Sequence, residues 1–111
     1  MQPTNLVQDT IHVERTIQAP LTSAWAAYSD TSVRSTWGVP LGEGLVYERD
    51  DLRSGGSAMH RCGDPAELQF HVATDYLVVV PSTLVVHTET VRLGEQLLST
   101  SSHLLGVYRS R

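Results

Sequence analysis

The sequence predicts an α+β fold in which one strand and two short helices precede a curved antiparallel sheet of about five further strands. The chain has 111 residues, of which 41% are hydrophobic, enough for the core of one domain and not of two. Apolar residues recur at helical spacing only between residues 20 and 37. From residue 45 onward, runs rich in β-branched residues alternate with turns that contain glycine or proline, which is typical of antiparallel strands.

The start of the chain is predicted to be a loose leader, residues 1–10, ahead of a single domain over residues 11–111. At the beginning of that domain Ile11, Val13 and Ile17 follow a two-residue period. Alternation of this kind is typical of a half-buried strand, so we expect this segment to form the first strand.

The first helix is predicted over residues 20–29. Leu21, Ala24, Trp25 and Tyr28 have the i, i+3, i+4, i+7 spacing of an amphipathic helix. A proline at the start is well tolerated, because its missing N–H would have no partner in a first helical turn.

The second helix is predicted to begin at residues 30–32, since Asp, Thr and Ser can each cap a helix with a side-chain oxygen. Val33 and Trp37 lie four residues apart and would share one face. Gly38 supplies a typical helix stop. The run from there to residue 44 mixes glycines with a proline and is expected to be an exposed connection.

Strands dominate the rest of the chain. After the first of these strands, the paired Gly55 and Gly56 predict a tight turn, because glycine tolerates a positive φ. The strands are expected at residues 45–50, 57–62, 67–80, 83–91 and 96–108.

The longest strand leaves open which of its faces points inward. One row of side chains is Leu68, Phe70, Val72 and Tyr76, and the other is His71, Ala73, Leu77 and Val79. A one-residue bulge would exchange the two rows, so the sequence does not choose between them.

Charge and cysteine content exclude several classes of function. The formal net charge of −4 and the pI near 5.6 argue against a nucleic-acid-binding protein. The lone Cys62 cannot form an intramolecular disulfide, and the first ten residues lack the pattern of a signal peptide. We therefore expect a cytoplasmic protein without a membrane span. No glycine-rich phosphate loop is present, so no nucleotide cofactor is expected.

Several short motifs, in the same order along the chain, resemble the START-like, Bet v 1-like superfamily, in particular the group related to the C-terminal domain of the activator of Hsp90 ATPase. They are the segments VERTIQAPLTSAWAAYSD, DLRSGG and YLVVVPSTLVV, with Trp37-Gly38 between the first two. The family pattern has a proline where Ser54 stands here. The resemblance covers about residues 11–100 and implies a helix-grip fold around a ligand cavity.

The C-terminal segment STSSHLLGVYRSR departs from that family. Family members continue with another strand and a long helix across the concave sheet, whereas this segment has no helical stripe. We expect a second chain to cover the sheet, which makes the protein a homodimer. A truncated or frame-altered gene product is the alternative.

The resemblance and the apolar strand positions together indicate a cavity for a small hydrophobic or amphipathic molecule. Polar side chains such as His71, Tyr76 and His87 would orient the ligand. The same side chains could instead fill the core or the dimer interface. The candidate ligand-binding residues are Trp37, Met59, Phe70, His71, Val72, Tyr76, Val85 and His87.

Other chemical groupings are weaker. His60, Cys62 and His71 could approach one another as metal ligands or as a Cys-His nucleophile, but their spacing matches no known motif. The acidic cluster from Glu48 to Asp51 is interpreted as a solvated turn, with Asp51 and Arg53 bracing it. We expect no metal, no cofactor and no catalytic residue.

The predicted function is therefore non-catalytic binding of a small apolar or amphipathic ligand, in a cavity formed or completed by dimerisation. The resemblance implies two alternatives: a protein-interaction module that contacts a chaperone of the Hsp90 type, and an enzyme similar to the polyketide cyclases.

Overall fold

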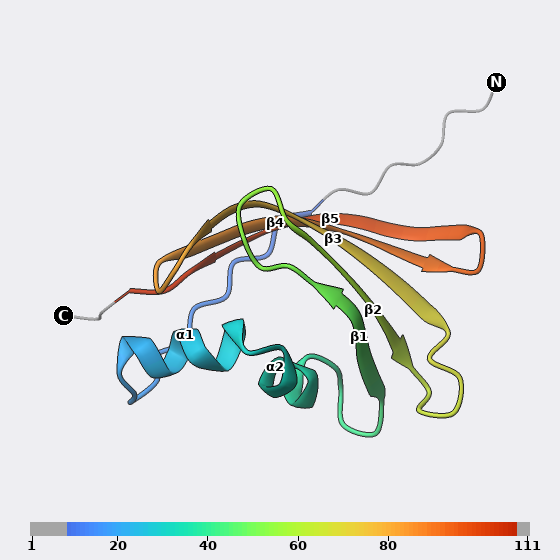
Figure 1. Ribbon diagram of the computed structural model, residues 1–111, viewed down its shortest axis with the longest axis horizontal. Helices are drawn as coiled ribbons and strands as arrows, with labels where there is room; N and C mark the ends of the chain where they lie inside the picture. Colours follow the sequence, from blue (N-terminus) through green and yellow to red (C-terminus); the bar gives the residue numbers. More distant parts are fainter. Residues whose placement is uncertain (1–8, 109–111) are drawn as a thin grey trace.

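Two short helices lie against the concave face of a five-stranded antiparallel sheet (Figure 1). The computed structural model describes residues 9–108. The predicted α+β class, with two helices ahead of a five-stranded sheet, is confirmed. The elements are α1 (Leu21–Ser29), α2 (Thr31–Trp37), β1 (Gly44–Asp50), β2 (Ser57–Gly63), β3 (Phe70–Val80), β4 (Leu84–Leu93) and β5 (Gln96–Gly106).

A single residue, Asp30, separates the two helices. Its backbone N–H donates to the carbonyl of Ala26 at the end of α1, over 3.1 Å. Its carboxylate accepts from the N–H groups of Ser32 and Val33 in the first turn of α2. Of the three residues predicted as possible caps, Asp30 is the one that caps α2, and the predicted stop at Gly38 is confirmed. Neither helix within residues 9–108 is long and apolar enough to cross a membrane.

The sheet is a simple meander in the order β1-β2-β3-β4-β5, with every neighbouring pair antiparallel. Register shifts interrupt three of the four pairings, and such bulges increase twist and bending. β3 begins at Phe70 and not at residue 67 as predicted. The N–H groups of Glu67 and Leu68 both donate to the carbonyl of Asp64, so the turn continues further along the chain.

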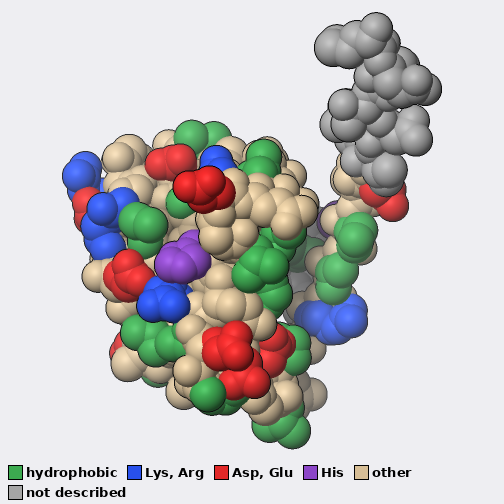
Figure 2. Space-filling view, turned by 90° about the vertical axis from the view of Figure 1, so that its right-hand side faces the viewer, with side chains coloured by type: hydrophobic (Ala, Val, Ile, Leu, Met, Phe, Trp, Pro, Cys, Tyr) green, Lys and Arg blue, Asp and Glu red, His purple; other side chains and the backbone are tan. Residues whose placement is uncertain are grey.

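The strand predicted at residues 11–17 does not form: residues 9–20 are neither helix nor strand. The side chains of Ile11, Val13 and Ile17 are 82%, 65% and 61% exposed. Alternation can form a strand only beside a partner strand, and the described β5 pairs with β4 alone. Most of the predicted leader, residues 1–8, lies outside the described residues. Figure 2 shows the described arm beside a body of mixed charged and apolar side chains.

Each of the two predicted rows of side chains on β3 faces the core over part of the strand. Val72 and Tyr76 are buried, whereas Leu77 and Val78 are exposed. The register shift between Tyr76 and Val78 then returns Val79 to the inner side, where it packs against the core. A bulge therefore exchanges the rows, and the core of Ala58, Tyr76 and Val85 forms around it.

The turn after β1 is hydrogen-bonded to the same point of β3. Gly55 N–H donates to the carbonyl of Tyr76, and the N–H of Tyr76 donates to the carbonyl of Gly56, over 2.9 and 3.0 Å. A Cβ atom on Gly56 would lie 2.1 Å from the carbonyl oxygen of Asp51, so only glycine fits. The hydroxyl of Ser54 accepts from the N–H of Val79. The turn thus fixes the end of β1 over the bulge.

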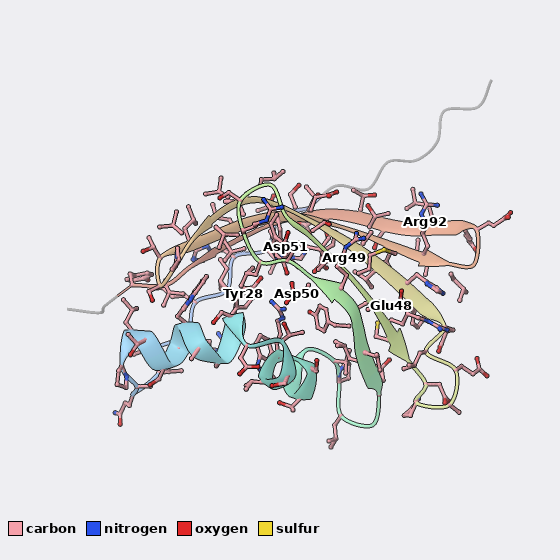
Figure 3. All side chains as sticks on the ribbon, viewed as in Figure 1. Tyr28, Glu48, Arg49, Asp50, Asp51 and Arg92 are labelled. Atoms are coloured by element: carbon pink, nitrogen blue, oxygen red, sulfur yellow. The ribbon has the colours of Figure 1, made fainter. Side chains whose placement is uncertain are left out.

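Asp50, at the end of β1, is buried and not solvated as its acidic surroundings indicated. Figure 3 shows it between the helices and the sheet. Its side chain is 5% exposed and forms an ion pair with the guanidinium of Arg34, itself 6% exposed. The carboxylate also accepts from the hydroxyls of Thr31 and Tyr76, over 2.7 and 2.8 Å. The interpretation as a solvated turn is correct for Asp51, which forms an exposed ion pair with Arg53.

Asp50→Asn should lower the free energy of unfolding by about 3 kcal/mol, because it leaves the buried charge of Arg34 without its counter-ion. Urea denaturation followed by circular dichroism measures the loss. Asp51→Asn is the matched control and should change stability by less than about 1 kcal/mol, since its ion pair is exposed. Equal effects from the two substitutions would contradict the assigned role of Asp50.

Candidate functional site

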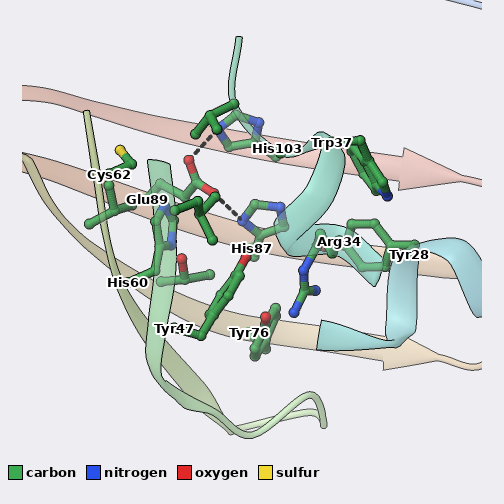
Figure 4. Close-up of a pocket in the computed structure, with 15 residues that line it drawn as sticks. Tyr28, Arg34, Trp37, Tyr47, His60, Cys62, Tyr76, His87, Glu89 and His103 are labelled. Atoms are coloured by element: carbon green, nitrogen blue, oxygen red, sulfur yellow. Dashed lines mark ion pairs between the residues drawn. The ribbon is translucent and has the colours of Figure 1, made fainter. Parts of the chain in front are cut away.

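A pocket of about 330 Å³ lies between the helices and the concave face of the sheet (Figure 4). It is partly open to solvent. Every strand and both helices contribute side chains to it, because the bent sheet turns its inner side chains toward the helices. The lining residues are Tyr28, Arg34, Trp37, Gly38, Val39, Leu45, Tyr47, His60, Cys62, Val72, Thr74, Tyr76, His87, Glu89 and His103.

Four of the eight predicted ligand-binding residues lie on this pocket: Trp37, Val72, Tyr76 and His87. Val72 and Tyr76 share the inner row of β3, and His87 follows Val85 on the inner side of β4. Trp37 closes the helical side, where its indole N–H donates to the carbonyl of Ala27 over 3.1 Å.

The other four predicted residues lie elsewhere. Val85 is completely buried in the core, in the cluster against which Trp25 and Tyr28 pack. His71 is exposed on the convex side, because it is paired with Arg61 and Arg92 on the outer rows of β2 and β4. Met59 lies in the outer row of β2, and Phe70 lies at the start of β3, paired with Cys62; neither lines the pocket.

Sequence reasoning missed several lining residues, above all Arg34, Glu89 and His103. Glu89 lies two residues after His87, so the two-residue period of a strand could have placed it on the same face. His103 becomes a neighbour of His87 only through the pairing of β4 with β5. Nothing in the local pattern distinguishes Arg34 from a solvated helical residue.

Arg34 lies between two aromatic rings. Its guanidinium carbon is 5.0 Å from the ring centre of Tyr28 and 4.8 Å from that of Tyr47. Both contacts are cation–π interactions that hold the guanidinium in place. Burial raises the pKa of both tyrosines, while the charge of Arg34 opposes that shift. Burial and the hydrogen bond to Asp50 raise the pKa of Tyr76 strongly, so these hydroxyls stay protonated.

Two histidines stack on one wall of the pocket beside a carboxylate. The rings of His87 and His103 are 4.7 Å apart and nearly parallel, at 4°. Glu89 lies 3.9 Å from Nδ1 of His87 and 3.7 Å from Nε2 of His103 (Figure 4). Burial, with the nearby charges of His103 and Arg34, lowers the pKa of His87 to about 4. Burial also lowers the pKa of His60. The rings of His87 and His60 are therefore neutral near pH 7.

Three buried polar atoms of the pocket residues have no hydrogen-bond partner within the described protein. They are Nε of Arg34, Nδ1 of His60 and Nδ1 of His87. Buried polar atoms are nearly always satisfied, and an unsatisfied one costs about 1–3 kcal/mol. Three in one pocket indicate a polar surface organised for a partner that the protein itself does not supply.

The weaker groupings are separated by the fold. His71 points to the convex side, away from His60 and Cys62, which line the pocket. Among residues 9–108, no three His, Cys, Asp or Glu side chains are arranged to hold a metal ion. Burial raises the pKa of the Cys62 thiol, which makes it a poorer nucleophile at neutral pH.

Comparison with known structures identifies the same fold in three bacterial proteins. A crystal structure from Rhizobium loti is 19% identical with a TM-score of 0.71, and the match covers 86% of this chain and 69% of that one. A crystal structure from Chromobacterium violaceum is 23% identical with a TM-score of 0.67, covering 76% and 65%. A solution structure from Staphylococcus epidermidis is 17% identical with a TM-score of 0.71, covering 87% and 61%.

The chain thus spans about two thirds of the length of these three structures. No family model and no curated protein matches the chain. At identities below one quarter, the likeness establishes the fold and does not extend to activity.

The lowered pKa of His87 makes stability depend on pH. Between its ordinary value of 6.5 and its folded value of about 4, the unfolded chain binds the extra proton, so stability falls as pH falls. From this group we expect a loss of about 2 kcal/mol between about pH 7.5 and pH 5. His87→Gln should remove most of that slope in urea denaturation, whereas the exposed His71→Gln should leave it. An unchanged slope in His87→Gln would contradict the assignment.

Proposed function

We propose that this protein is a START-like domain that binds a small amphipathic molecule in the concave pocket without transforming it. The observation that carries the proposal is the set of three unpaired buried polar atoms in a pocket whose other walls are largely aromatic and apolar. Ligand sites typically combine an apolar lining with a few polar groups that fix orientation. The motif resemblance and the shared fold support the family; the lone cysteine supports a cytoplasmic location.

Size and acid–base properties favour binding over catalysis. The volume of about 330 Å³ lies at the lower end of the range for small-molecule pockets, which suits a ligand of one or two rings. A general base works best with a pKa near the working pH, whereas that of His87 is about 4. The cyclase-like and chaperone-contact alternatives stay predictions.

A second copy of the chain is proposed to complete the pocket along β5. This strand is an edge of the described sheet, it carries neither charge nor proline from Gln96 to Gly106, and it supplies His103 to the pocket. Leu98 and Leu104 are 44% and 74% exposed. Edge strands without charge or proline readily pair with another strand. Two such edges paired antiparallel would extend the pocket floor beyond His103.

The expected interface is small. Eleven paired residues at about 3.3 Å rise and about 10 Å sheet thickness bury roughly 700 Å² over both chains. Stable complexes usually bury about 1,200 Å² or more, so the dimer should be weak and dependent on concentration.

Ligand binding can be tested with naphthylmethanol, whose fused rings suit the volume of the pocket. Fluorescence titration of the probe should detect saturable binding to the natural protein. Cys62→Phe should weaken it by about tenfold or more, because the larger side chain occupies the pocket. Ala73→Phe, on the exposed outer row of the adjacent strand, is the control and should bind normally. Absence of saturable binding, or equal effects of both substitutions, would count against the pocket.

Dimerisation can be tested by light scattering after size exclusion over a range of protein concentrations. The mass should rise from 12.2 kDa toward twice that value as concentration increases. Leu104→Lys should keep the protein monomeric, because a lysine on an edge strand opposes strand pairing. Leu41→Lys, at a fully exposed position in the α2–β1 connection, should not change the mass. A natural protein that is monomeric throughout would refute the dimer.

A further inference from the structure

The charges around the pocket do not cancel. Arg34 and Asp50 form one neutral pair. Glu89 is the remaining carboxylate on the pocket wall, with a side chain 29% exposed. The distances of 3.9 and 3.7 Å to the two stacked histidines exceed hydrogen-bond length. The pocket thus holds one carboxylate whose charge is matched by no arginine.

His87 does not neutralise Glu89 near pH 7. Burial holds His87 neutral, and the proximity of His103 opposes its protonation further. The negative charge of Glu89 acts across the pocket, since it contributes to raising the pKa of Tyr28, Tyr47 and Cys62. A cation entering the pocket would therefore meet a carboxylate that neither an arginine nor His87 neutralises.

The hydrogen-bonding atoms at this wall call for a donor with more than one N–H. Nδ1 of His87 is buried and unpaired, and it lies 3.9 Å from Oε1 of Glu89. A nitrogen between the two atoms could donate to both at about 2.8 Å, which is a normal length for such bonds. His87 would accept through Nδ1 in its neutral form.

The opposite wall suits the apolar part of such a ligand. Trp37, Tyr28 and Tyr47 present aromatic side chains toward the pocket (Figure 4). Ring faces attract cations as well as apolar surface. The unpaired Nε–H of Arg34 remains as a donor for a hydroxyl or ether oxygen on the body of the ligand.

We propose that the ligand is a primary or secondary amine, protonated at neutral pH, whose N–H groups bond Glu89 and Nδ1 of His87 while an aromatic body lies against Trp37 and the tyrosines. This inference rests on the proposed ligand-binding function. It names the chemical class of the ligand and one residue, Glu89, that selects it.

Three probes with the same naphthyl ring and different head groups test the proposal: naphthylmethylammonium, naphthylmethanol and naphthoate. The ammonium should bind the natural protein about tenfold more tightly than the alcohol, as one charge-assisted hydrogen bond at a partly exposed site predicts. Naphthoate should bind most weakly. If no probe binds, the proposed function fails. If the alcohol or naphthoate binds as tightly as the ammonium, the function stands and the amine inference is wrong.

Glu89→Gln should remove the preference for the ammonium over the alcohol. Glu48→Gln, an exposed carboxylate on β1 outside the pocket, is the matched control and should preserve the preference. An ammonium preference that persists in Glu89→Gln would overturn the role of this residue. The comparison of head groups in the natural protein tests the amine class even if Glu89→Gln does not fold.

Affinity for the ammonium should fall as the pH is lowered from about 6 to about 4, because protonation of His87, whose pKa is about 4, removes the Nδ1 acceptor and adds a charge that repels the cation. The titratable and charged groups that face Glu89 around the pocket are Tyr28, Arg34, Tyr47, His60, Cys62, Tyr76, His87 and His103. Of these, His87 gains charge in that interval. Affinity for the ammonium that rises on acidification would contradict the proposed contact.

Discussion

The buried ion pair of Arg34 and Asp50 holds the two layers of this protein together. Neither helix presents a continuous apolar face: α1 has no fully buried residue, and the one buried residue of α2 is Arg34. The buried contact of α2 with the sheet is therefore polar. Such a pair offsets its desolvation only when both groups are fully hydrogen-bonded. The hydroxyls of Thr31 and Tyr76 and the rings of two tyrosines supply that environment.

The geometry of the pair depends on the glycine turn after β1. Backbone hydrogen bonds from Gly55 and Gly56 to Tyr76 place the end of β1 above the bulge of β3. Asp50 and the hydroxyl of Tyr76 therefore meet, although they are far apart in the sequence. The same bulge turns Val79 back toward the core. One turn thus organises the ion pair, the core and one wall of the pocket.

The pocket lies beside this ion pair. Aromatic and imidazole side chains line the space between the helices and the sheet. Unpaired nitrogens remain there, whereas the core beneath α1 is closed around Val85. The distinction between core and pocket therefore runs along β4, where Val85 lies in the core and His87, two positions later, lines the pocket. Sequence patterning groups these side chains together because they share one face of a strand.

Local physics in the sequence determined the α+β class, both helices, a cap for the second helix within residues 30–32 and its stop at Gly38, and the approximate positions of five strands. Periodicity, capping and turn chemistry depend on neighbours within a few residues, so they can be read directly. Four of the eight predicted ligand-binding residues line the pocket, although the two-residue period left both faces of the longest strand open. Tertiary contacts alone bury Asp50, make β3 change face at a bulge, leave residues 11–17 without a partner strand and bring His103 beside His87 and Glu89. Each of these depends on contacts between distant segments, whose energies no local pattern contains.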